Sequence, residues 1–150
     1  MNLNKSEKEF VLKALIPFIM SQQGNGFAMS TWKAFRPAGA LFTVDHVKRV
    51  VPPCGTVACL GGSIEMLKKI PDIDRIYGRL LGMTHNQREG LFYHWPWYEY
   101  EYRPFCWPRD LSTRFFRART TEGKARVACA LLRRIVKFGG QVMHNKGYKG

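Results

Sequence analysis

The clearest helical pattern in this chain, residues 121–138, limits what the whole chain can fold into. Thr121 is suited to cap this helix, and Gly139-Gly140 supplies a stop. At about 100° per residue, one side of the helix is apolar and the other is basic. Such a helix must bury its apolar side against other elements, so a core is required. The apolar side consists of Ala125, Ala128, Cys129, Leu132 and Ile135.

Prolines and glycines divide the rest of the chain into shorter elements. Ser6-Glu7-Lys8-Glu9 has the form of a capping box, with Ser6 as the N-cap. Apolar residues follow it at helical spacing, and Pro17 is expected to kink or end that helix. Three prolines in 95–108 prevent one regular element there. The remaining predicted elements are a short strand or an extended loop near 27–32, a helical turn at 45–50, and helices at 56–69, 74–81 and 84–93.

Length and composition fit one domain. The chain has 150 residues, of which 45% are hydrophobic, and this excludes a wholly disordered chain. No internal repeat or linker separates two cores. We therefore predict a mainly α, compact single domain of about four to five helices over 1–140, with an aromatic, proline-rich loop before the last helix. A flexible basic tail is predicted over 141–150.

The charge of the chain narrows its partner classes. Lys and Arg number 24 against 11 Asp and Glu, a net charge of +13, which favours a polyanion or an acidic surface as partner. Most of the excess lies in residues 101–150, where guanidinium groups suit phosphate contacts. The alternative is a solvated helix face that keeps the protein soluble. The candidate anion-binding residues are Arg114, Arg117, Arg119, Arg126, Arg133, Arg134 and Lys137.

A second unusual feature is the aromatic run from Phe92 to Trp107. It holds nine aromatic residues in sixteen positions, too many for one helix or strand to bury on one face. The run predicts a protein interface, a base-stacking surface or a proline-braced loop over the core. The candidate interface residues are Trp95, Trp97, Tyr98, Tyr100, Tyr102 and Trp107.

The most idiosyncratic motif is Cys54-Gly55-Thr56-Val57-Ala58-Cys59. A thiol at a helix start has a lowered pKa, so Cys54 is a weak candidate nucleophile, with His85 or His94 as base. Zinc is a second reading, but the spacing matches closed structural sites poorly, and no metal site is predicted. The favoured reading is small structural thiols at a tight helix junction. The zinc reading would use Cys54, Cys59, Cys106 and His94.

Other sequence signals argue against catalysis and against a membrane. No phosphate-cradling loop, dinucleotide-binding glycine motif or HExxH is present, so no cofactor is predicted. The longest uncharged run, 14–32, is too polar to cross a bilayer, and no membrane partner is predicted. Four cysteines without a secretory signal are typical of reduced thiols in a cytoplasmic protein.

Two motifs carry a family resemblance. Phe27-x-Met29-x-Thr31-Trp32, followed by C-G-T-x-A-C-L-x-G from Cys54 to Gly62, resembles a family of small uncharacterised bacterial and phage proteins. The likeness extends over about 24–140. It implies a recurrent fold and a phage or mobile-element origin, and it brings no established activity. It supports the structural reading of the two thiols at 54 and 59.

The sequence therefore predicts a small, basic, non-enzymatic binding protein of phage or mobile-element origin. It would engage nucleic acid, or a host nucleoprotein complex, through its basic C-terminal helix. The first alternative is an inhibitor or adaptor that binds an acidic protein surface through the aromatic loop. The second alternative is a thiol-dependent enzyme that uses Cys54.

Overall fold

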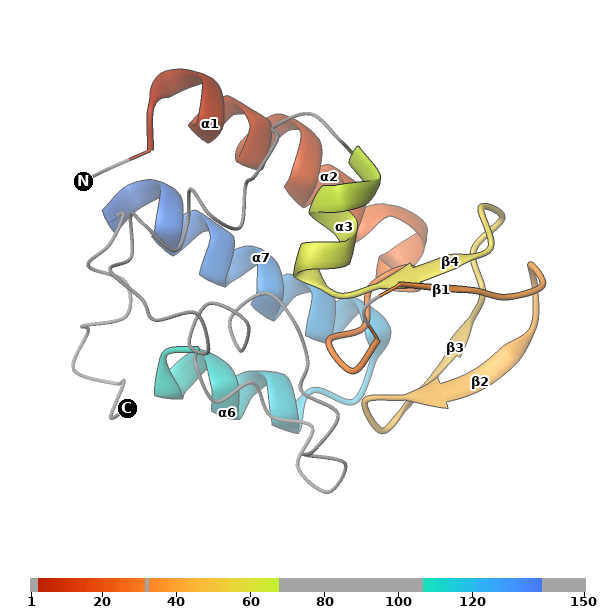
Figure 1. The fold of residues 1–150 in the computed structure, drawn as a ribbon. Coiled ribbons are helices and arrows are strands. Elements are labelled where there is room, and N and C mark those ends of the chain that lie inside the picture. Colours follow the sequence, from red (N-terminus) through yellow and green to blue (C-terminus); the bar gives the residue numbers. More distant parts are fainter. Residues whose placement is uncertain (1–2, 32, 68–106, 139–150) are drawn as a thin grey trace.

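A computed structural model describes residues 3–31, 33–67 and 107–138 (Figure 1). The fold is mainly helical with two small two-stranded sheets, which confirms the predicted fold class. The helical elements are α1 (Lys5–Phe10), the π-helix η1 (Val11–Leu15), α2 (Ile16–Met20), the 3-10 helix η2 (Ser21–Gly24), α3 (Leu60–Leu67), α6 (Arg109–Arg117) and α7 (Thr121–Phe138). The strands are β1 (Lys33–Phe35), β2 (Leu41–Val44), β3 (Val47–Val50) and β4 (Thr56–Ala58).

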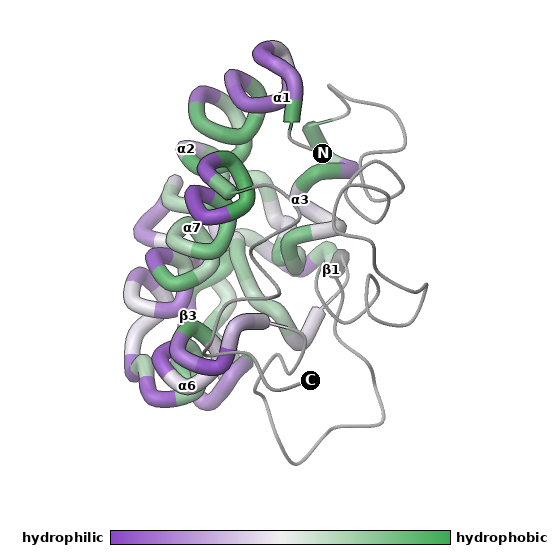
Figure 2. The backbone as a smooth tube through the Cα atoms, turned by 90° about the vertical axis from the view of Figure 1, so that its left-hand side faces the viewer, coloured by the Kyte–Doolittle hydropathy of each residue, from purple (hydrophilic) through white to green (hydrophobic). Residues whose placement is uncertain are grey.

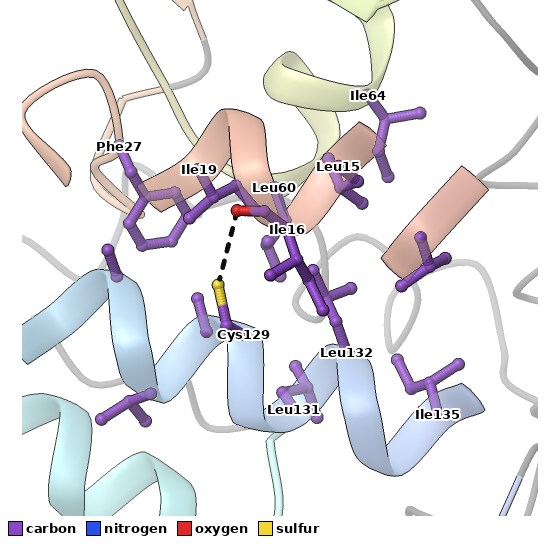
Figure 3. Packing of buried hydrophobic residues seen from close by; sticks show 14 of the residues in the cluster. Leu15, Ile16, Ile19, Phe27, Leu60, Ile64, Cys129, Leu131, Leu132 and Ile135 are labelled. Carbon is purple, nitrogen blue, oxygen red and sulfur yellow. Dashed lines mark hydrogen bonds between the residues drawn. The ribbon is translucent and has the colours of Figure 1, made fainter. Parts of the chain in front are cut away.

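Helix α7 lies at the centre of the core. In Figure 1 it runs between α1–α2 on one side and α6 on the other, and it packs directly on η1, α2 and α6. Figure 3 shows its apolar side meeting side chains of η1, α2 and α3. All five residues of the predicted apolar side are buried, which confirms the amphipathic pattern. Burying a large apolar side chain such as Leu132 or Ile135 contributes roughly 1.5–3 kcal/mol, so this side anchors the fold.

The first helix begins two residues earlier than predicted. The Asn4 side chain, not that of Ser6, accepts a hydrogen bond from the Glu7 N–H at 2.8 Å, and the Glu7 carboxylate accepts one from the Asn4 N–H. Pro17 neither ends nor breaks the helical path, which continues to Met20. The π-helix η1 widens the turn just before Pro17, where a proline ring would otherwise meet a preceding carbonyl.

The motif that begins at Phe27 and the motif that begins at Cys54 lie side by side at a small sheet. Strand β4 pairs antiparallel with β1, and its Ala58 also bridges Phe27 in parallel. The Cys59 N–H donates to the Thr31 carbonyl at 2.7 Å. Of residues 27–31 only Phe27 makes a bridge, so the extended loop is correct there rather than the short strand, and the first strand begins at Lys33. The helix predicted from Thr56 begins only at Leu60, because the residues before it form β4.

The predicted helical turn at 45–50 is a β-hairpin instead. Strands β2 and β3 pair antiparallel from Leu41↔Val50 to Val44↔Val47. The two turn residues, Asp45 and His46, have φ values of 52° and 60°. Positive φ at both central positions is the geometry that matches the twist of a two-residue hairpin. The hairpin turn lies near the start of α7, and β3 packs on that helix (Figure 1).

Helix α7 has the predicted bounds, but its cap lies one residue earlier. The Thr120 hydroxyl accepts from the Gly123 N–H at 3.0 Å, while the Thr121 hydroxyl donates to the Gln23 carbonyl. Helix α6, which the sequence did not indicate, begins after Pro108 and packs antiparallel beside α7 (Figure 1). The predictions for 74–81, 84–93, 92–106 and 141–150 lie outside the described residues. No described helix has the length and apolar character needed to span a membrane.

Candidate nucleic-acid interface

The α6–α7 hairpin gathers most of the described cations. Residues 107–138 contain nine basic and two acidic side chains. In Figure 2 both helices alternate between hydrophilic purple and hydrophobic green, as expected where one side is buried and the other is charged. We call six of the exposed cations of this hairpin, all of them predicted anion-binding residues, the basic face. It comprises Arg114, Arg117, Arg119, Arg126, Arg133 and Lys137.

One predicted anion-binding residue, Arg134, forms an ion pair within the fold. The Arg134 guanidinium donates two hydrogen bonds to the two carboxylate oxygens of Asp110, one of them at 2.9 Å. The bond from Arg134 lowers the pKa of Asp110, and the same contact raises the pKa of Arg134. This bidentate pair joins α6 to α7 at their half-exposed seam. Arg134 is therefore a positioning residue between the helices rather than a group available to a ligand.

Most of the basic face has no acidic partner. Arg126 forms an ion pair with Glu122, one helical turn earlier on α7, and both side chains are largely exposed. Exposed pairs of this kind are weak, so Arg126 can exchange its partner for another anion. The other five cations of the face form no ion pair with any described residue.

Three cations form a stripe along α7. At about 100° per residue, Arg126, Arg133 and Lys137 fall within roughly 40° of one another on the side opposite the buried one. At about 1.5 Å per residue, Arg126 and Lys137 lie roughly 16 Å apart along the helix axis. One strand of a DNA duplex presents a phosphate about every 3.4 Å along its axis, so the stripe spans about five of them. The spacing suits contacts to a sugar–phosphate backbone.

Two further cations are buried and belong to the core. Lys124, only 1% exposed, donates from Nζ to the Phe115 carbonyl at 2.7 Å and lies 4.4 Å from the Phe115 ring centroid. Burial lowers the pKa of Lys124 to about 8, with Arg49 also lowering it and Asp45 opposing. The sequence carries a signal for this site, since Lys124 falls between Ala128 and Leu131 on the apolar side of α7.

Arg49 is the second buried cation, and it ties the hairpin to the sheet. Its Nη1 donates to the Phe27 carbonyl and, at 3.1 Å, to the Asn25 carbonyl. Asp45 lies 4.0 Å from its Nη2. Burial lowers the pKa of Arg49, and Asp45 raises it. Because the sequence pattern missed the β2–β3 hairpin, it gave no reason to place Arg49 inside.

The aromatic prediction changes for Trp107. Trp107 is fully buried, with its ring edge-on to Phe115 at 5.3 Å between centroids. It was predicted as an interface residue, but it fills the core at the start of α6. The other candidate interface residues, Trp95, Trp97, Tyr98, Tyr100 and Tyr102, lie outside the described residues.

The positions of the thiols do not agree with the hypothesis that Cys54 is a catalytic nucleophile at a helix start. Cys54 is exposed in a turn closed by Gly55, whose N–H donates to the Pro52 carbonyl. Cys54 does not begin a helix, because β4 follows it, so the helix-start argument for Cys54 as a nucleophile is wrong. Cys129 is buried against the Ile16 carbonyl (Figure 3), and burial raises its pKa to about 11.

Cys59 is also buried, which agrees with the structural reading of that thiol. Gly55, which follows Cys54, has φ +72°, and a Cβ there would lie 2.9 Å from the Arg36 carbonyl oxygen, so the turn requires glycine. No cluster of three or more metal-binding side chains occurs within 3–31, 33–67 and 107–138. His85, His94 and Cys106 lie outside those ranges.

Comparison with protein-family models, curated proteins and solved structures found no match to this chain. The family resemblance of the two motifs therefore stays a prediction.

Proposed function

We propose that this protein binds nucleic acid by contacting phosphates through the basic face of the α6–α7 hairpin. The observation that carries the proposal is a set of five exposed cations without an acidic partner among the described residues, on one helical hairpin. Natural surfaces usually intersperse both signs of charge, and a single-sign field of this kind attracts polyanions. The protein would act as a binding protein, on bare nucleic acid or within a nucleoprotein complex.

The chemistry of the face favours backbone contacts that do not depend on base sequence. Its members are five arginines and one lysine, and guanidinium groups donate paired hydrogen bonds to phosphate oxygens. The bond between Arg134 and Asp110 holds the two helices together, so the backbone positions that carry the cations on either side of the seam are fixed relative to one another. A pre-formed array loses less conformational entropy on binding than a mobile tail does.

An acidic protein surface is the competing partner, because it would satisfy the same cations. A duplex differs in presenting closely and regularly spaced anions on a stiff backbone, and the stripe of Arg126, Arg133 and Lys137 is long enough to extend along several of them. A flexible polymer of glutamate carries the charge without that fixed spacing. Competition between the two anions therefore separates nucleic-acid binding from general attraction to acids.

The test is fluorescence anisotropy with a labelled 16-base-pair duplex, a single-stranded DNA and an RNA of equal length, each with polyglutamate as competitor. The variant carries Arg133→Gln and Lys137→Gln, which replace two exposed cations that form no ion pair with a described residue. The matched control carries Lys5→Gln and Lys48→Gln, which remove equal charge from exposed sites on α1 and β3. We expect the first variant to bind the duplex roughly tenfold more weakly, because two phosphate contacts are lost.

The control double variant should remain within about twofold of the wild type, because its lysines lie away from the basic face. An equal loss of duplex affinity in both double variants would mean that net charge alone determines binding, and this would contradict the proposal. Displacement of the duplex by polyglutamate at equal charge would instead assign the face to an acidic protein.

A further inference from the structure

The β2–β3 hairpin presents an open strand edge. Within the described ranges β2 pairs with β3 alone, and β3 is the strand that packs on α7. Figure 1 accordingly shows β2 on the outer side of the hairpin. An unpaired edge carries backbone donors and acceptors that can bind another extended chain.

The two-residue turn determines which backbone groups face that edge. In a hairpin of this type Val44 and Val47 close the turn as a hydrogen-bonded pair. Bonded and non-bonded pairs alternate along an antiparallel ladder, so Leu41 and Thr43 fall in non-bonded pairs. Their N–H and C=O groups therefore point away from β3. Together they offer two donors and two acceptors to an added strand.

The edge lacks the devices that usually protect such strands. Residues 41–44 read Leu-Phe-Thr-Val, with no charge and no proline, and the Leu41 side chain is 78% exposed. Between Glu9 and Glu65 the chain has a single acidic residue, Asp45, and it is buried. The surface around the edge is therefore apolar and cationic.

Arg36 places a cation on the opposite side of β2 from Leu41. Its guanidinium lies 4.9 Å from the centroid of the Phe42 ring, and Phe42 alternates with Leu41 along the strand. The Arg36 side chain is exposed and forms no ion pair with a described residue. The contact with the aromatic ring holds the guanidinium in place, where it can form an ion pair with a carboxylate.

We propose that the β2 edge binds an extended segment of a partner protein in which apolar and acidic residues alternate. Backbone hydrogen bonds to Leu41 and Thr43 would align the segment. Because successive side chains of a strand point to opposite faces, one residue would cover Leu41 and the next would present its carboxylate to Arg36. A second copy of this chain fits poorly, since each copy has a net charge of +13 and brings its own Arg36.

The experiment measures binding of a fluorescein-labelled peptide, Val-Glu-Val-Asp-Val-Glu-Val, by anisotropy. Thr43→Pro removes the outward N–H and leaves the ladder to β3 intact, and Thr43→Val is its matched control. Arg36→Gln removes the cation, and Lys48→Gln removes an exposed charge from the other strand of the hairpin. Circular dichroism and urea unfolding establish that each variant is folded, and sedimentation velocity reports self-association.

We expect Thr43→Pro to weaken peptide binding by roughly tenfold or more, and Arg36→Gln by roughly fivefold with a smaller salt dependence. Thr43→Val and Lys48→Gln should stay within about twofold of the wild type. Wild-type affinity in a folded Thr43→Pro variant would overturn the proposal, and so would no binding of the peptide to the wild type. A wild-type dimer that Thr43→Pro dissociates would assign the edge to a second copy instead.

Discussion

At the scale of single residues, Lys124 couples the stability of the fold to pH. Its pKa falls from an ordinary value of 10.5 to about 8, chiefly because the ammonium is buried. The unfolded chain therefore binds this proton more tightly than the folded chain does. The free energy of unfolding should rise as pH increases between about 8 and 10.5. Below that pH range Lys124 is charged in both states, and burial of the ammonium lowers the free energy of unfolding by its full amount.

The measurement is urea unfolding of the wild type and of Lys124→Met at pH 7 and pH 10. Methionine fills similar space and carries no charge, so groups that titrate in both proteins cancel in the difference. Relative to the wild type, the variant should lose about 2 kcal/mol of its stability between the two pH values, at about 1.4 kcal/mol per pKa unit. A difference that does not change with pH would mean that Lys124 is not charged and buried as described.

At the scale of elements, the junction of η2 with α7 depends on Gly24. This residue has φ +76°, and a Cβ there would lie 2.8 Å from both the Ala125 Cβ and the Thr121 carbonyl oxygen. Gly39 has a similar φ of +81° but nothing within 4 Å of the same point. Gly24→Ala should cost roughly 3 kcal/mol, and Gly39→Ala about 1 kcal/mol. Equal shifts in the urea midpoint would contradict this packing.

The elements also show what sequence patterns can predict. Helix α7 (residues 121–138) was predictable because apolar residues recur at helical spacing over its 18 residues, which make about five turns, and because two glycines follow it. The β2–β3 hairpin was not, because its turn is Asp45-His46 rather than a glycine-containing pair, and its strands have four residues each. Helix α6 is nine residues long and its apolar side has only Leu111 and Phe115, which is too little periodicity to recognise.

The same limit applies to the candidate site. That Arg126, Arg133 and Lys137 share a side of α7 follows from helical spacing alone. The bond between Arg134 and Asp110 does not, because its partners are 24 residues apart and meet only when α6 packs on α7. The burial of Trp107 likewise depends on tertiary packing against Phe115.

At the scale of the whole molecule, the residues that stabilise the fold are distinct from the exposed residues proposed to bind partners. The apolar side of α7 and the buried cations Arg49 and Lys124 hold the helices and the β2–β3 hairpin together. The basic face and the β2 edge lie on different elements, so the two proposed binding activities should be independent. Thr43→Pro should leave duplex binding unchanged, and the variant with Arg133→Gln and Lys137→Gln should leave peptide binding unchanged.

The most direct test of the central claim is the salt dependence of duplex binding. The logarithm of the association constant falls linearly with the logarithm of salt concentration, by about 0.9 for each phosphate contact. The variant with Arg133→Gln and Lys137→Gln should give a slope shallower than that of the wild type by about two, while the Lys5→Gln and Lys48→Gln control keeps the wild-type slope. Equal slopes for all three proteins would contradict the assignment of these cations to phosphate contacts.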